Sequence, residues 1–120
     1  MDTKFHSVLE QLVRNANLEG AILSTPDGLP IESVIAPSLS EERLSAMAAA
    51  ILSLGEKAVE ELKKGSLEQI TVKSEKGYVI TTGIGREAVL TVMTGNGAKL
   101  GLLYLEIKKA VNELKNLLEV

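Results

Sequence analysis

Few side chains in this sequence could take part in catalysis or bind a metal ion. Cysteine is absent, which excludes thiolate catalysis and a cysteine-ligated zinc site, and the single histidine, His6, leaves little for a catalytic triad or a histidine-rich metal site. Neighbouring carboxylates occur in two places, at Glu41-Glu42 and Glu60-Glu61. Adjacent residues of a helix diverge by about 100°, so neither pair can share one proton or one metal ion. We therefore expect no catalytic residue, no metal site and no enzymatic activity, and we interpret His6 as a packing or surface residue.

A glycine-rich segment at residues 94–101, TGNGAKLG, follows a predicted strand and opens a helix, as a phosphate-binding loop would. The Walker pattern is G-x-x-x-x-G-K-[ST], but here Lys99 precedes Gly101 and the required Ser or Thr is missing. We interpret the glycines as turn and packing residues and Asn96 as the helix cap. The sequence thus predicts no nucleotide cofactor and no tight nucleotide binding.

Composition limits the class of protein further. The chain has 120 residues, 45% of them hydrophobic and 24% charged, as expected for one globular domain over residues 1–120. A net charge of −3 and only three aromatic residues argue against a nucleic-acid-binding protein. No segment reaches the roughly 18 apolar residues of a membrane span, and the N-terminus has no apolar signal core, so we expect a cytoplasmic protein. The mean hydropathy of +0.16 is high for a small domain and favours a partner or self-association.

The spacing of apolar residues changes several times along the chain, as it does in an α+β domain. Three segments have helical spacing, and five are rich in β-branched residues and bounded by turn residues. The predicted helices cover residues 3–16, 40–64 and 100–118, and the predicted strands cover 18–24, 29–35, 67–74, 78–84 and 87–94. The order is therefore α-β-β-α-β-β-β-α. Pro30 cannot donate to a strand ladder and predicts a blunted sheet edge, whereas strand 67–74 has no proline and can pair with another strand.

The middle helix has two faces of different character. On a helical wheel its larger apolar residues form one continuous face, which we expect to face the core: Leu44, Met47, Ala48, Ile51, Leu54, Ala58 and Leu62. The first half of the opposite face is small and nearly uncharged: Ser45, Ala46, Ala49, Ala50 and Ser53. Small residues at a spacing of four allow another helix to approach closely, although alanine also favours helices by itself. We favour a helix-packing interface.

The element order and several segments together resemble the roadblock domain family, which includes the dynein light chain of that name and the prokaryotic mutual gliding protein B regulators. The similarity is carried by LEGAILSTPDGLPIES with its Asp27-Gly28 turn, by the Ala-rich helix, and by YVITTGIGREAVLTVMTGNGAKLGLLYLEIKKA. It extends over nearly the whole chain, although each part is a soft pattern and none is a catalytic fingerprint. The resemblance implies a five-stranded antiparallel sheet of order 2-1-5-4-3, with the middle helix on one face and the terminal helices on the other.

The same resemblance implies a homodimer, in which the third strands pair and the middle helices pack together, and a non-catalytic partner of Ras-like small GTPases. Such a partner acts as a scaffold or stimulates GTP hydrolysis. On helix 40–64 we accordingly expect a GTPase platform and dimer contact formed by Arg43, Ser45, Ala46, Ala49, Ala50, Ser53, Glu56 and Lys57. The wheel does not tell which side of the helix meets the second copy. On strand 67–74 we expect a dimer edge that includes Leu67, Gln69, Thr71 and Lys73.

A second class of function stays open from the sequence alone. Profilin-like or PAS-like domains of similar shape sense small ligands or act as adaptors, and they need a polar pocket between sheet and helix. The helices here supply mostly Leu, Ile, Val and Ala, which leave few converging polar groups. We therefore favour the GTPase regulator over the ligand sensor.

Overall fold

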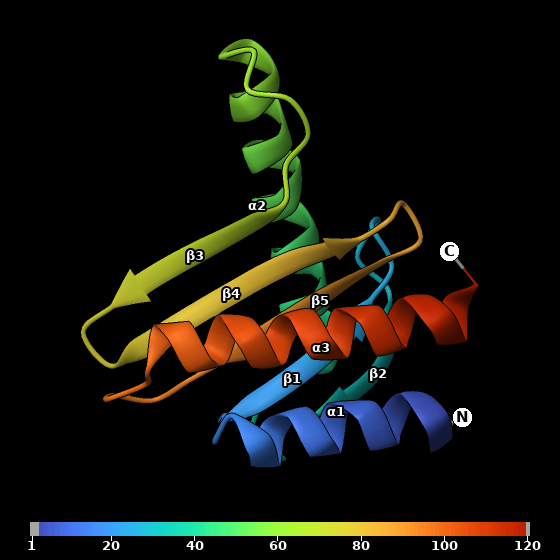
Figure 1. Cartoon of the computed structure of the whole chain (residues 1–120), viewed down its shortest axis with the longest axis vertical. Coiled ribbons are helices and arrows are strands. Elements are labelled where there is room, and N and C mark those ends of the chain that lie inside the picture. The colour runs from blue at the N-terminus through green and yellow to red at the C-terminus, as the bar shows by residue number, and fades with distance from the viewer. Residues whose placement is uncertain (1–2, 120) are drawn as a thin grey trace.

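Five strands form one antiparallel sheet in the computed structural model, which describes residues 3–119. The strands are β1 (Gly20–Ser24), β2 (Pro30–Val34), β3 (Gln69–Ser74), β4 (Gly77–Ile84) and β5 (Ala88–Met93). Their order across the sheet is β2-β1-β5-β4-β3, which confirms the prediction (Figure 1). Pro30 begins the edge strand β2, and the ladder is irregular opposite it, between Leu23 and Ser24. The proline thus lies at an edge, where its missing N–H costs no central hydrogen bond.

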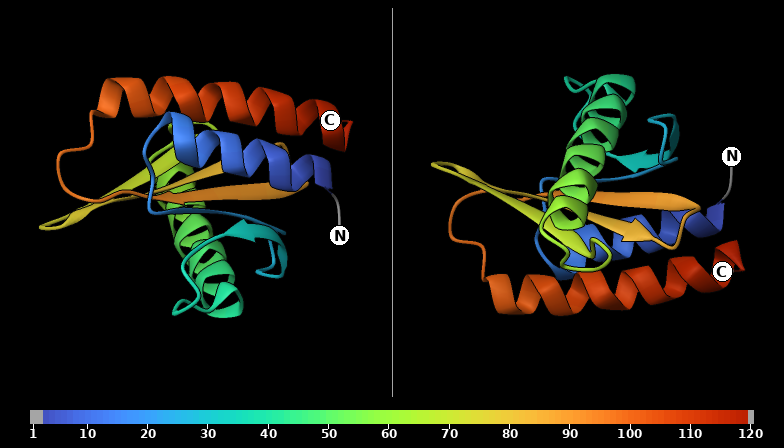
Figure 2. Two further views of the ribbon diagram at one scale, coloured as in Figure 1. Left: turned by 90° about the horizontal axis from the view of Figure 1, so that it is seen from below. Right: turned by 90° about the horizontal axis from the view of Figure 1, so that it is seen from above.

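Three helices complete the predicted order. They are α1 (Thr3–Asn15), α2 (Glu41–Glu61) and α3 (Leu100–Leu118). Helices α1 and α3 lie side by side on one face of the sheet, and α2 crosses the other face (Figure 2). The predicted two-and-one arrangement of helices is therefore confirmed, and the fold is an α+β sandwich.

Some element ends differ from the prediction. Strand β3 starts two residues later than expected, at Gln69. Helix α2 ends at Glu61 because the chain turns into the left-handed region at Lys63, where φ is 53°. Asn96 does not cap α3: the N-cap is Lys99, which has no side-chain acceptor for the first turn. The glycine-rich segment therefore precedes the helix instead of forming its first turn.

The main hydrophobic core lies between the sheet and the α1–α3 layer. Apolar side chains at helical spacing on the two helices meet alternate residues of β1, β4 and β5. Fully buried members include Leu9, Leu23, Ile80, Leu90, Ile107 and Leu114. Burial of each such side chain contributes about 1.5–3 kcal/mol. Among the described residues, none from α2 belongs to this core cluster.

The opposite face of the sheet, which α2 covers, carries smaller and more polar buried side chains than the main core. Strand residues that alternate with the core positions point to this side, and they include Ser24, Thr81 and Thr91. The hydroxyls of Thr81 and Thr91 share a buried hydrogen bond of 3.3 Å. Helix α2 has 21 residues, all of which the structure describes, and three of them are buried: Ser45, Ala48 and Leu52. Helix α2 is therefore held to its own chain by few large apolar contacts.

Candidate protein interface

Helix α2 presents to solvent part of the face that its apolar pattern predicted to be buried, although Ala48 of that face is buried as predicted. Met47, Leu54 and Leu62 are 55%, 71% and 67% exposed, so their assignment to the core is wrong. Ser45, assigned to the outer face, is fully buried. The helical wheel correctly separated large from small residues, but which of them are buried depends on the shape of the sheet surface beneath the helix. Here the sheet and a neighbouring turn approach closely, so Ser45 and Ala48 are buried and Ala49 is half-buried, while Ala46, Ala50 and Ser53 stay exposed.

The turn between β1 and β2 lies against two of the small residues of α2, Ala46 and Ala49. A β-carbon placed on Gly28 would lie 3.2 Å from Ala46 Cα and 3.4 Å from Ala49 Cβ. Gly28 also has a φ of 95°, which side chains rarely adopt. Farther along the helix, a β-carbon on Gly55 would overlap the Ile70 side chain of β3. Ala46 and Ala49 therefore lie against this chain's own turn, although the sequence interpretation had assigned them to a contact with a second helix.

The exposed side of α2 carries what we call the α2 apolar stripe. Its residues follow a spacing of four and three, which aligns them on one face: Met47, Ile51, Leu54, Ala58 and Leu62. Ala50 and Ser53 lie beside the stripe and are exposed. The last turns of α2 project past β3 (Figure 1), so the end of the stripe is not supported by the sheet. An apolar surface of this kind is typical of a contact with another protein.

Strand β3 forms the other sheet edge. It pairs with β4 on one side, and within residues 3–119 no strand lies on its other side. The side chains of Gln69 and Thr71 point to the α3 face, where the amide of Gln69 donates to Thr82 Oγ1 at 3.1 Å and the hydroxyls of Thr71 and Tyr104 are 2.9 Å apart. These contacts leave the outer backbone groups of β3 available for pairing.

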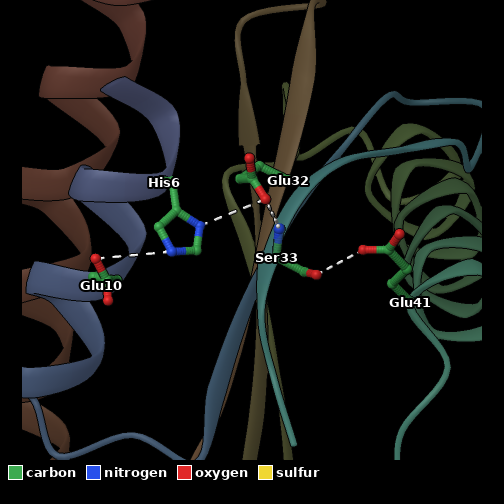
Figure 3. A network of polar contacts seen from close by, with 5 residues as sticks. All are labelled: His6, Glu10, Glu32, Ser33 and Glu41. Atoms are coloured by element: carbon green, nitrogen blue, oxygen red, sulfur yellow. Dashed lines mark hydrogen bonds and ion pairs between the residues drawn. The ribbon is translucent and has the colours of Figure 1, made fainter. Parts of the chain in front are cut away.

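A series of polar contacts joins α1 to the start of α2 through the edge strand β2 (Figure 3). His6 lies between two carboxylates, with Nε2 3.7 Å from Glu10 Oε1 and Nδ1 3.5 Å from Glu32 Oε1. Nδ1 makes no hydrogen bond among the described residues, so the second contact is electrostatic when His6 is protonated. The Glu32 carboxylate accepts from the N–H of Ser33, whose hydroxyl donates to Glu41 Oε2 at 2.6 Å. This network holds the first turn of α2 to the sheet.

Comparison with known proteins places this geometry in a family. The model of the Roadblock/LC7 domain matches residues 4–94, which span α1 to the end of β5. The chain belongs to the Roadblock/LC7 family. Two uncharacterized proteins of Methanocaldococcus jannaschii are each 32% identical to it over 108 residues, which cover 90% of this chain and 94% of each relative.

Solved structures of similar fold also align with this chain beyond residues 4–94, which the family model matches. MglB of Myxococcus xanthus superposes with a TM-score of 0.93 at 25% identity, over 98% of this chain and 96% of that one. A structure described as MglB with tetrameric arrangement gives a TM-score of 0.85 at 19% identity, over 95% of this chain and 87% of that one. Helix α3 of this Roadblock/LC7 domain is thus part of the shared fold, although it lies outside the family-model match.

The structure distributes the expected interface residues of this Roadblock/LC7 domain over two sides of α2. Ser45 is buried, Ala49 is half-buried against the turn, and the others are exposed: Arg43, Ala46, Ala50, Ser53, Glu56 and Lys57. On the edge, Leu67 precedes β3, whereas Gln69, Thr71 and Lys73 belong to it. The sequence analysis did not identify the large residues of the α2 apolar stripe as interface candidates, because it assigned them to the core. Their signal was present, because two unlike apolar faces on one helix require two packing partners.

The remaining chemistry of this domain is sparse. In the part of the chain that the structure describes, no group of three or more His, Asp or Glu side chains is placed to hold a metal ion. None of its described helices is long and apolar enough to cross a membrane. Arg86 lies exposed in the turn between β4 and β5. The surface features that distinguish the domain are therefore the α2 apolar stripe and the open β3 edge.

Proposed function

We propose that this Roadblock/LC7 domain forms a homodimer that binds a Ras-like small GTPase and acts as a non-catalytic regulator or scaffold. The observation that carries the proposal is the α2 apolar stripe, which is exposed on a helix that contributes little to its own core. A helix with this exposure gains stability when a second protein covers it.

The second copy of the chain fits the same region. Pairing of two β3 edges would extend the sheet and satisfy backbone groups that are open in one copy. The end of α2 projects past the start of β3 and would then reach over the partner (Figure 1). Burial of Met47, Leu54 and Leu62 would contribute about 1.5–3 kcal/mol for each side chain. A tetrameric arrangement of MglB, a similar fold, supports self-association.

The surface left on the paired helices provides the GTPase platform. Ala50 and Ser53 offer a small, uncharged centre, and Arg43, Glu56 and Lys57 form a charged rim around it. A smooth centre with a polar rim is typical of protein interfaces. If hydrolysis is stimulated, the dimer acts by positioning the catalytic groups of the GTPase itself. Arg86 is then dispensable, and Arg86→Ala leaves stimulation intact.

A binding measurement tests this function. Each Ras-like GTPase encoded in the same genome is purified, loaded with GDP or a non-hydrolysable GTP analogue, and titrated with the full-length protein by calorimetry. We expect binding that prefers one nucleotide state and is weakened at least tenfold when Arg43, Glu56 and Lys57 are reversed in charge. Binding unaffected by these reversals would move the site off α2. Absence of binding to every such GTPase would favour the ligand-sensing alternative.

A further inference from the structure

The turn between β1 and β2, residues 25–29, exposes a large apolar side chain next to α2. This residue is Leu29, which is 62% exposed. It directly follows Gly28, which lies against Ala46 and Ala49 of the helix. The surface of the first half of α2 therefore continues from the helix onto this turn, and Leu29 lies where the two meet.

Hydrogen bonds within the chain close the turn that carries Leu29. The N–H of Thr25 donates to the carbonyl oxygen of Leu29 at 2.8 Å, and the N–H of Leu29 donates to Thr25 Oγ1 at 3.0 Å. The N–H of Gly28 donates to the carbonyl oxygen of Thr25 at 3.0 Å. A side chain on a turn held in this way is pre-organised, so little backbone freedom is lost when another protein covers it.

A second copy of the chain is not expected to pair with the sheet edge next to Leu29. Pro30 has no N–H, and both backbone groups of Leu29 are already bonded to Thr25. The ladder is also irregular here, between Leu23 and Ser24. Because β2 and β3 form opposite edges, the edge where the second copy is proposed to pair lies across the sheet from Leu29.

Helix α2 separates these two regions along its length and around its axis. It meets the turn at Ala46, and it meets Ile70 of β3 at Gly55, nine residues or about 13 Å farther along the helix. Met47 of the α2 apolar stripe follows Ala46 by one residue, so the two side chains lie about 100° apart around the axis. The turn therefore adjoins a different flank of α2 from the one that carries the stripe.

The proposed GTPase platform has a centre of small side chains, Ala50 and Ser53. Most of the binding energy of an interface comes from a few large side chains that fill pockets on the partner. Met47 and Leu54 are large, but they belong to the stripe, which we assign to the second copy. Leu29 adjoins the platform on its other flank and supplies the large apolar side chain that the centre lacks.

We propose that Leu29 is the apolar anchor by which this domain binds the small GTPase, and that the GTPase contact extends from α2 onto the β1–β2 turn. This inference rests on the proposed function. The partner surface that fits has an apolar pocket for the Leu29 side chain, beside a shallow area that covers Ala46 and Ala50. Because the second copy meets the stripe and the β3 edge, one domain contacts both proteins at the same time.

Single substitutions in the full-length protein test the anchor, by calorimetry with the GTPase that binds the unchanged protein. Leu29→Ala should weaken binding at least tenfold, while the mass measured by light scattering stays the same. Leu29→Met keeps an apolar side chain of similar size and should bind within threefold of the unchanged protein. Leu105→Ala is the matched control and should change binding less than twofold, since Leu105 is 56% exposed on α3, which covers the other face of the sheet (Figure 2).

The outcomes distinguish this inference from the proposed function. If the unchanged protein binds no Ras-like GTPase, the proposed function is wrong and the inference with it. If it binds one and Leu29→Ala binds equally well, only the inference is wrong, and the platform ends on α2. A lower mass for Leu29→Ala would assign Leu29 to the contact between copies and would also overturn the inference. In the unchanged protein, the NMR signals of the Leu29 methyl groups should shift when the GTPase is added, and unshifted signals would contradict a direct contact.

Discussion

Gly28 lies against Ala46, close enough that a β-carbon on the glycine would be 3.2 Å from the Ala46 Cα. This contact joins the turn after β1 to the first half of α2 on the side where the helix has few other anchors. It requires a glycine in the turn and small residues on the helix at the same time. The Asp27-Gly28 turn and the Ala-rich helix, which the sequence presents as separate signals, thus form one packing unit.

Replacement of Gly28 by alanine tests this packing unit. Gly28→Ala should destabilise the protein because φ is 95° and because the new methyl group meets α2. The backbone strain alone costs about 1–2 kcal/mol. Gly65→Ala is the matched control, since Gly65 has a φ of 89° but no atom within 4 Å of its added β-carbon. Urea unfolding should therefore give a larger loss for Gly28→Ala, and equal losses would contradict the packing role.

Ser45 offers a test in the opposite direction. Its side chain lies fully buried on the inner face of α2, and its Oγ has no hydrogen-bond partner among the described residues. Because an unsatisfied buried hydroxyl is costly, Ser45→Ala should raise the free energy of unfolding by about 1 kcal/mol. Ser53→Ala, at an exposed site of the same helix, reports helix propensity alone and should change it by a few tenths of a kcal/mol. A destabilised Ser45→Ala protein would mean that the hydroxyl has a partner in solution, such as a bound water.

The element order could be predicted from local signals, whereas the strand order across the sheet followed only from the resemblance to the roadblock family. Pro30 indicated an edge strand, and period-two and period-3.6 patterns separated strands from helices. Element ends were less predictable. Asn96 is a good cap residue by type, yet the helix starts four residues later, at Leu100, after a turn in which Gly97 has a φ of 81°.

The orientation of α2 could not be predicted from its own residues. Met47 and Leu54 are the kind of residue that fills a core, and a hydrophobic pattern does not tell whether the partner is the same chain or another one. The deciding facts are non-local: the turn at Gly28 approaches the helix, and the sheet beneath carries Thr81 and Thr91.

Asp27 gives a pH-dependent prediction. The Thr25 hydroxyl donates to Asp27 Oδ1 at 2.6 Å, and with the backbone N–H of Asp27 it holds the pKa of that carboxyl below its ordinary value of 3.8. A lowered pKa means that the stabilisation is present above pH 3.8 and is lost as the pH falls below it. Thr25→Val removes the donor, so the pKa measured by NMR titration should rise toward 3.8. Thr25→Ser retains a hydroxyl and should keep the pKa low, and an unchanged pKa in Thr25→Val would exclude this hydrogen bond as the cause.

Leu54 tests the proposed dimer, since it is the most exposed large side chain of the α2 apolar stripe, at 71%. Leu54→Glu would place a charge where the second copy is expected, and burying an unpaired charge is costly. Light scattering at micromolar concentration should give about twice the mass of one chain for the unchanged protein, and a lower mass, nearer to that of one chain, for Leu54→Glu. A mass near 13 kDa for the unchanged protein throughout would refute the dimer. Lys57→Glu, on the charged rim of α2, should leave the mass unchanged.

The same variant allows the stability of α2 itself to be measured. None of the described residues of α2 belongs to the main core, so a single copy holds this helix by the contacts at Ser45, Ala48 and Leu52 and by the network through Glu41. We therefore expect its amide hydrogens to exchange at least tenfold faster in Leu54→Glu than in the dimer, while those of β1 and β5 change little. Such a pattern follows from local opening of an element with few buried apolar contacts. Uniform acceleration in all elements would instead indicate global destabilisation, and unchanged exchange in α2 would show that the helix needs no partner.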